Sequence, residues 1–233
     1  MKKVLSVAML VLLCLLAGCG KTPTPQTSVV STAEINSFLT NAGFPQEVMS
    51  TISFSQKQVI YKTALDKTVR FYGLSEMGFV LESSGMFAPA ETGDTPDLTL
   101  SVLTVTIQTE DGKTAYGVYP AFRWHTEKLV TNDEFEMEMY SGWAAVPGER
   151  NFRLCYQPKD SIVVNAVERD PYNAGQLGYT YKMESKLAGA DAQYAGYAYY
   201  MVEKTVDTAM EVIILRYAHK DNQATAPLYL KAN

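Results

Sequence analysis

Cysteine and histidine are scarce in this sequence of 233 residues. It has 3 cysteines, at positions 14, 19 and 155, and 2 histidines, His125 and His219. Because Cys155 alone lies beyond the first twenty residues, no disulfide can form within a domain built from the rest of the chain. We therefore expect that domain to be stabilised by its hydrophobic core, which a chain of roughly 200 residues is long enough to form.

The motifs of several enzyme classes are also missing. The chain has no Gly-x-Ser-x-Gly nucleophile elbow, no Ser-x-x-Lys pair, no His-Glu-x-x-His zinc motif and no phosphate-binding glycine loop. Cys155 with His125 or His219 is the one thiol–imidazole combination, and a lone strand cysteine usually fills space. We assign no catalytic residue and expect no cofactor and no metal centre.

Clusters of basic residues are absent as well. The formal net charge is −5, with 20 lysines and arginines against 25 aspartates and glutamates. Proteins that bind nucleic acids or anionic lipid surfaces concentrate positive charge. The charge pattern therefore argues against a nucleic-acid partner.

The N-terminal segment has the layout of an export signal. Lys2 and Lys3 precede the apolar run 4–16, which is followed by small residues and then by polar ones. The run is too short to cross a bilayer as a helix, which takes about 20 apolar residues. Residues 1–18 are therefore expected to be a signal peptide.

The end of this run, Leu16-Ala17-Gly18-Cys19, resembles the lipobox of bacterial lipoproteins. The resemblance implies cleavage before Cys19 and a diacylglyceryl group, with palmitate-like chains, on that cysteine. Two or more acyl chains anchor a protein stably. The expected location is the outer face of a bacterial membrane, with the bilayer as partner through Cys19. Residues 19–31, rich in Thr, Pro and Ser, are expected to form a flexible tether.

Residues 32–65 are predicted to be a helical segment that packs on the rest of the domain. Ser31 and Glu34 have the spacing of a capping box, as do Ser53 and Gln56 before a second helix. Apolar residues then recur on one helical face at Ile35, Phe38, Leu39 and Ala42.

Residues 66–233 show the period of two that is typical of β-strands. In "LTLSVLTVTIQT" (98–109) the apolar parity changes between Val102 and Leu103, which indicates a bulge or a crossing between sheets. Asp111-Gly112 then predicts a hairpin. Strands do not alternate with helices, so the predicted fold is mainly β. We expect an antiparallel β-sandwich, of which the jelly roll is one form, with a short N-terminal helical segment.

Three glutamates alternate along one predicted strand, at Glu134, Glu136 and Glu138. Alternate residues on a strand stand about 6.8 Å apart on one face, so the carboxylates repel each other. A calcium ion would relieve that repulsion. The other interpretation is a solvated outer face that discourages aggregation between sheet edges. We favour the second and keep the row as a weak calcium candidate.

Aromatic residues give the better candidate for a binding surface. Tyr179 and Tyr181 share a face of one strand, Tyr197 and Tyr199 share a face of another, and Trp124 lies beside a polar segment. If these rings faced outward together, they would offer a platform for a sugar or an extended peptide. The alternative is that they pack inside the sheet layers.

These observations predict a membrane-anchored, extracytoplasmic lipoprotein that is a non-catalytic binding or structural module of the cell envelope, with a glycan or peptide as ligand. The alternative is an envelope hydrolase that acts on glycans through a carboxylate pair. Such a pair must lie about 5 Å or 6.5–9.5 Å apart across a cleft, and the sequence does not reveal that distance.

Overall fold

The computed structural model describes residues 30–125, 133–157, 162–163, 166–169, 177–183 and 193–231, with side chains for all of these except 55, 147–177 and 182–194. The chain divides into two compact units, Met1–Ser31 and Thr32–Asn233, and the fold below is that of the second. The expected signal peptide, Cys19 and nearly all of the tether lie outside the described residues, as does the side chain of Cys155. No helix in the described ranges has the length and apolar character needed to cross a membrane.

Three helices come first along this unit: α2 (Thr32–Asn41), α3 (Gln46–Thr51) and α4 (Phe54–Ala64). Helix α4 begins where the sequence predicts, because the hydroxyl of Ser53 accepts a hydrogen bond from the backbone N–H of Gln56 (3.2 Å).

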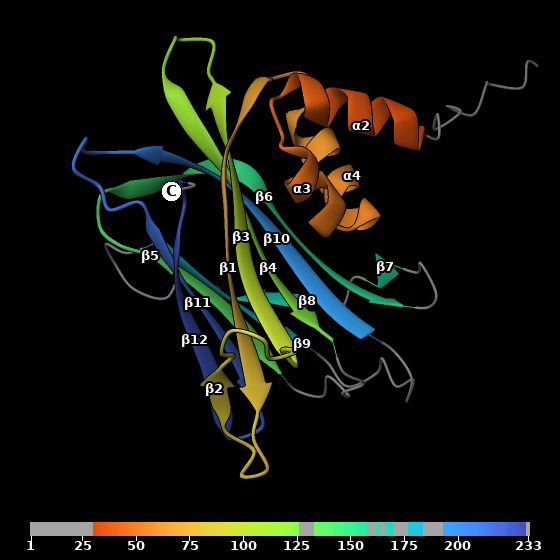
Figure 1. Cartoon of the computed structure of the whole chain (residues 1–233). Helices are drawn as coiled ribbons and strands as arrows, with labels where there is room; N and C mark the ends of the chain where they lie inside the picture. Colours follow the sequence, from red (N-terminus) through yellow and green to blue (C-terminus); the bar gives the residue numbers. More distant parts are fainter. Residues whose placement is uncertain are drawn as a thin grey trace, which may run out of the picture. The chain divides into compact units, whose positions relative to one another are not determined.

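The strands form two antiparallel sheets (Figure 1). Every pairing within them is antiparallel, as predicted. In spatial order, the seven-stranded sheet contains β2 (Phe87–Pro89), β1 (Thr68–Leu81), β3 (Leu98–Gln108), β4 (Thr114–Trp124), β10 (Gln193–Lys204), β6 (Trp143–Gln157) and β7 (Ile162–Val163). The five-stranded sheet contains β12 (Asn222–Tyr229), β11 (Val212–His219), β5 (Glu134–Met139), β9 (Leu177–Met183) and β8 (Ala166–Arg169). The predicted hairpin at Asp111-Gly112 joins β3 to β4, with Gly112 at a φ of 80° that suits glycine.

The two sheets face each other across one hydrophobic core, which confirms the predicted β-sandwich. On β5 the apolar side chains point into this core and the glutamates point away, as the alternation in the sequence predicts. The largest fully buried core side chains from the two sheets are Phe122, Trp124, Tyr200, Phe135 and Tyr217.

A second apolar layer lies on the outer face of the seven-stranded sheet, where the helices are gathered (Figure 1). Leu39 and Ile60 of the helices are fully buried. The helical layer is hydrogen-bonded to the sheet: Phe71 N–H donates to the carbonyl of Ala42 (2.8 Å). Leu103, Val105 and Ile107 of β3 are buried on this outer face, because they alternate with strand neighbours that face the other way.

The parity change in β3 therefore has a different cause from the one expected. The register of β3 with β4 runs unbroken from Leu98 to Gln108, and the bulge in the pairing of β3 with β1 lies in β1, between Phe71 and Gly73. The predicted bulge or crossing at Val102–Leu103 of β3 is therefore wrong. Both faces of β3 are covered near Leu103, one by the other sheet and one by the helices. The helices do not cover the first half of β3, and there the outward-facing positions are the small polar residues Thr99 and Ser101. The change in apolar parity along β3 therefore marks the position at which the helices cease to cover the outer face of the sheet.

Candidate binding groove

The five aromatic residues predicted to form an outward platform are all buried, at 0–5% exposure. Trp124, Tyr179 and Tyr181 belong to the core between the sheets, whereas Tyr197 and Tyr199 lie on the helix-covered face. The prediction of an exposed aromatic platform is wrong for these side chains, since they are divided between two interior layers.

Their polar ends are satisfied inside the protein, which explains how so many tyrosines can be buried. The Trp124 indole N–H donates to the Tyr217 hydroxyl (2.9 Å), and the hydroxyls of Tyr181 and Tyr200 are hydrogen-bonded to each other. Tyr179 stacks on Tyr200 with ring centroids 4.5 Å apart.

The acidic row on β5 faces outward, next to an arginine of the neighbouring strand. The guanidinium of Arg216 lies 2.8 Å from a carboxylate oxygen of Glu138 and 3.6 Å from one of Glu136. The guanidinium of Arg216 thereby offsets the mutual repulsion of these glutamates without a metal ion. Among the described residues, no group of three or more potential ligands is arranged to hold a metal ion.

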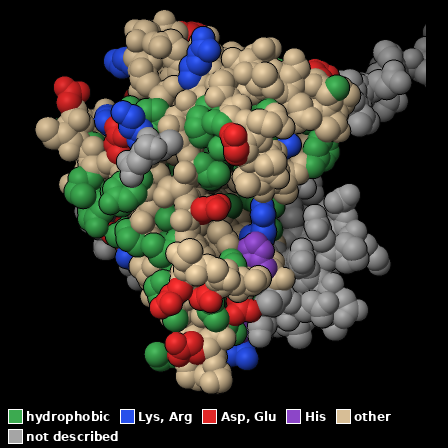
Figure 2. All heavy atoms as spheres, viewed as in Figure 1, with side chains coloured by type: hydrophobic (Ala, Val, Ile, Leu, Met, Phe, Trp, Pro, Cys, Tyr) green, Lys and Arg blue, Asp and Glu red, His purple; other side chains and the backbone are tan. Residues whose placement is uncertain are grey.

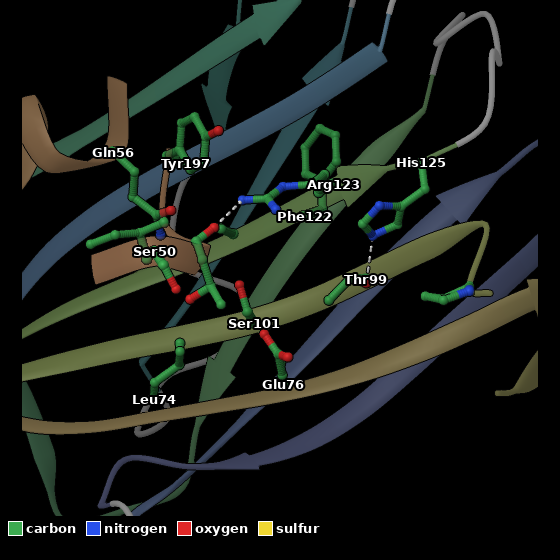
Figure 3. A pocket seen from close by; sticks show the side chains of 14 residues that line it. Ser50, Gln56, Leu74, Glu76, Thr99, Ser101, Phe122, Arg123, His125 and Tyr197 are labelled. Atoms are coloured by element: carbon green, nitrogen blue, oxygen red, sulfur yellow. Dashed lines mark hydrogen bonds between the residues drawn. The ribbon is translucent and has the colours of Figure 1, made fainter. Parts of the chain in front are cut away.

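A groove opens where the helical cover stops, on the outer face of the seven-stranded sheet. Its volume is about 350 Å³, within the size range of small-ligand sites. Figure 3 shows side chains from α3, α4, β1, β3 and β4 converging on it. The space-filling view of Figure 2 shows a histidine side chain on the visible face, next to a basic side chain.

The strand register sets the floor of the groove, where small side chains lie between larger ones. Glu76, Ser101, Ala121 and Tyr197 pair in one row across β1, β3, β4 and β10. The next row contains Gly78, Thr99, Arg123 and Ala195. A methyl group at Gly78 would lie 3.0 Å from Cβ of Pro96, so the missing side chain lets the Pro96 loop approach. Small floor residues leave the volume open to a ligand.

Several groove side chains are fixed by hydrogen bonds. The guanidinium of Arg123 donates to the carbonyl of Thr51 (3.1 Å), at the end of α3. The Nε2 atom of His125 lies 2.8 Å from the hydroxyl oxygen of Thr99. These contacts hold the cation and the imidazole at one end of the groove (Figure 3).

Other polar groups in the groove are left without protein partners. The side chain of Gln56 is 3% exposed, yet its amide makes no hydrogen bond to any described residue. Instead of returning to Ser53 as a capping box requires, it points toward the groove (Figure 3). The Ser101 hydroxyl and the Glu76 carboxylate also make no hydrogen bond within the described ranges, although Glu76 acts electrostatically on His125. Unlike Asn36 Oδ1 and Thr104 Oγ1, which are enclosed without a partner, the amide atoms of Gln56 are open to the groove, where water or a ligand can bind them.

The electrostatics of the groove favour a neutral imidazole. Burial lowers the pKa of His125, and the positive charge of Arg123 lowers it further, while Glu76 and Asp97 act in the opposite direction. At neutral pH, His125 therefore contributes a hydrogen-bonding ring and no charge, and Arg123 is the groove's one cation among the described lining residues.

A second pocket of about 390 Å³ lies at the far end of β4 and β10, lined by Lys113, Thr114, Tyr116, Glu203, Lys204 and Asp207. Its two lysines are already engaged, since Lys113 lies 2.7 Å from Asp111 and Lys204 lies 2.6 Å from Glu211. Because both lysines already form ion pairs, they are less available to bind a ligand than the polar groups of the groove.

Of the predicted binding residues, only Tyr197 lines the groove, where its hydroxyl is 2.9 Å from the hydroxyl of Ser53. The sequence did carry a signal for two other residues of the groove. Thr99 and Ser101 stand at the positions where Leu103 and Val105 would continue the apolar face, and that polar interruption marks open floor.

No protein-family model matches the sequence, and no curated protein matches it either. Among solved structures, the chain is similar to a carbohydrate-binding module described as recognising mannan specifically, with a TM-score of 0.24 and 12% sequence identity. The match covers 78% of this chain and 95% of that chain. A likeness at this level carries no argument about the ligand. Any inference about the ligand must therefore rest on the residues of the groove.

Proposed function

We propose that this protein is a lipid-anchored module of the bacterial cell envelope that binds a glycan in the groove without catalysing a reaction. The observation that carries the proposal is the amide of Gln56, which opens into the groove from a side chain that is otherwise buried and has no hydrogen-bond partner among the described residues. The membrane anchor is proposed on the Leu16-Ala17-Gly18-Cys19 motif.

The type of polar group in the groove favours a sugar over a peptide. Peptides that add a strand need an unpaired sheet edge. The groove lies on a sheet face, where β1, β3, β4 and β10 are already paired with one another. It therefore offers side-chain hydroxyl, amide, carboxylate and guanidinium groups, which suit a ligand rich in hydroxyls.

The groove is a poor fit to the alternative of a glycan hydrolase. Such an enzyme places two carboxyl groups on opposite sides of the bond that it cleaves. Glu76 is the one carboxylate among the described residues that line the groove. A single carboxylate can bind a hydroxyl but cannot serve as both the acid and the nucleophile or base.

The proposal is tested by titrating the full-length protein, purified in detergent, with a panel of soluble envelope oligosaccharides. Gln56→Ala should weaken binding by about 0.5–1.5 kcal/mol, which is the typical net value of one hydrogen bond. Gln58→Ala is the matched control, since Gln58 lies in the same helix outside the groove. The absence of any binding, or equal losses in the two variants, would refute the proposal.

A further inference from the structure

We infer that the bound glycan is acidic and that its carboxylate is received by the guanidinium of Arg123. This inference rests on the proposed function, because it names the class of sugar that the same groove takes. It follows from how Arg123 is placed relative to the other charged groups of the domain.

Arg123 is a half-buried cation without an ion-pair partner among the described residues. Two comparably buried cations are neutralised: Lys204 lies 2.6 Å from Glu211, and Arg216 lies 2.8 Å from Glu138. Arg123 donates one hydrogen bond, to the carbonyl of Thr51, and this bond is exposed to solvent, so the other N–H groups of Arg123 are accessible to a ligand. An anionic ligand would complete its coordination.

The geometry of the guanidinium supports a carboxylate as that anion. A guanidinium has five N–H donors in a planar fork that matches the two oxygens of a carboxylate. Arg123 donates from one nitrogen to Thr51, which fixes the orientation of the plane and leaves the other N–H groups available. The neighbouring imidazole is held by Thr99, so it adds a polar wall beside the anion.

Among the described residues, no ion pair joins Glu76 to Arg123. Arg123 pairs with Thr99, and Thr99 pairs with Gly78, so Glu76 lies two strands across and two residues along. Strand spacings of about 4.8 Å and a step of about 6.8 Å place the two Cα atoms about 12 Å apart. The floor residue Ser101 lies in the row of Glu76. The groove is thus polarised, with a cation at one end and a carboxylate at the other that can accept sugar hydroxyls.

The test uses matched pairs of sugars with the full-length protein in detergent. The pairs are oligosaccharides of glucuronate and glucose, galacturonate and galactose, and N-acetylmuramate and N-acetylglucosamine. In at least one pair, the acidic member should bind about tenfold more tightly, as expected for charge-assisted hydrogen bonds. That preference should shrink as salt is raised, because salt screens the attraction.

Substitutions then test whether the preference for the acidic sugar depends on Arg123. Arg123→Gln should abolish the preference, so that the acidic and neutral members of a pair bind this variant equally, whereas Arg123→Lys should keep part of it because the charge remains without the fork. Arg70→Gln, which alters an exposed arginine of β1 outside the groove, should change nothing. Thermal melts check that each variant is folded, and Arg123→Lys carries the test if Arg123→Gln does not fold.

The outcomes separate the two proposals. Equal binding of the acidic and neutral members in every pair, or an acidic preference that persists in Arg123→Gln, overturns the inference while the glycan-binding function stands. Failure of every sugar to bind overturns both proposals. Binding of a peptide carboxylate at Arg123 without binding of any sugar also overturns both, and would identify a peptide as the ligand.

Discussion

His219 and Asp133 contact each other at the buried end of the sandwich. The imidazole Nδ1 lies 2.9 Å and 3.0 Å from the two carboxylate oxygens, and Asp133 is fully buried. The hydroxyl of Tyr217 donates to the same carboxylate (2.7 Å) and accepts from the indole of Trp124. The carboxylate of Asp133 thereby links β11 to the segment that precedes β5. The hydrogen bond between Tyr217 and Trp124 extends this network to β4.

Replacing Asp133 should therefore destabilise the domain strongly. Asp133→Ala leaves the hydroxyl of Tyr217 and the imidazole of His219 without their shared acceptor, and losing one partner of a buried pair costs about 3–5 kcal/mol. Chemical denaturation measures the free energy of unfolding. Glu110→Ala, at an exposed turn position, is the control and should be neutral. An unchanged stability in Asp133→Ala would mean that the network contributes little.

Gly196 should tolerate no side chain. A methyl group there would lie 2.2 Å from Cε1 and 2.7 Å from Cζ of Phe122, whose ring is fully buried and cannot move away freely. Gly196→Ala should lower the free energy of unfolding by about 1–3 kcal/mol through overpacking. Adding Phe122→Leu should recover part of that loss relative to Phe122→Leu alone. Additive effects of the two substitutions would argue against the clash.

Acidification should destabilise the protein through His125. Because burial and Arg123 lower the pKa of His125 in the folded state, the unfolded chain binds this proton more readily. Its contribution to stability is complete above the unfolded pKa of about 6.5 and is lost as the pH falls through the lower folded pKa. His125→Gln should flatten this part of the pH profile, measured by chemical denaturation at a series of pH values. A profile that steepens in the variant would contradict the assigned sign.

Calcium should leave the melting temperature unchanged, whereas removing Arg216 should lower it. Arg216→Gln withdraws the cation between Glu136 and Glu138, whose pairing is partly exposed to solvent. We expect a loss of up to about 1 kcal/mol, measured by thermal melts with chelator and with added calcium. If calcium raises the melting temperature and Glu136→Gln abolishes that rise, the acidic row is a calcium site after all.

Cys19→Ala should release the protein from the membrane fraction or leave its signal peptide uncleaved. The reason is that the resemblance to a lipobox makes this cysteine both the cleavage point and the site of acylation. Cell fractionation with immunoblotting measures both effects. Membrane association and processing that are identical to those of the unaltered chain would remove the basis for the anchor.

Local patterns in the sequence were sufficient for the elements and the fold class. The alternation along β5, the Asp111-Gly112 turn and the Ser53 cap each depend on neighbouring residues and are confirmed. The burial of Tyr197 and Tyr199 was not predictable in the same way, because it depends on which sheet face the helices cover. That cover is a contact between segments more than a hundred residues apart, such as Ser53 with Tyr197.

The groove was missed for the same physical reason. Gln56, Ser101 and Arg123 come from α4, β3 and β4, and strand register brings the last two together. The residue types alone are ordinary for a helix cap and a strand surface. What sets them apart is that the Gln56 amide has no hydrogen bond and Arg123 has no ion pair among the described residues, and both are properties of the folded chain.

The position of β12 beside β1 bears on when the domain can fold. Tyr229 N–H donates to the hydroxyl of Ser75 (3.3 Å), and Ala226 and Leu228 complete the inner face of the five-stranded sheet. Strand β11, their neighbour, is needed to pair with β5. Strand β12 thus contacts the first strand of the domain from the other end of the domain's sequence. Contacts between segments this far apart form late in folding, so we expect the core to form only once residues 212–229 are available, and an exported chain to stay unfolded until they have been translocated.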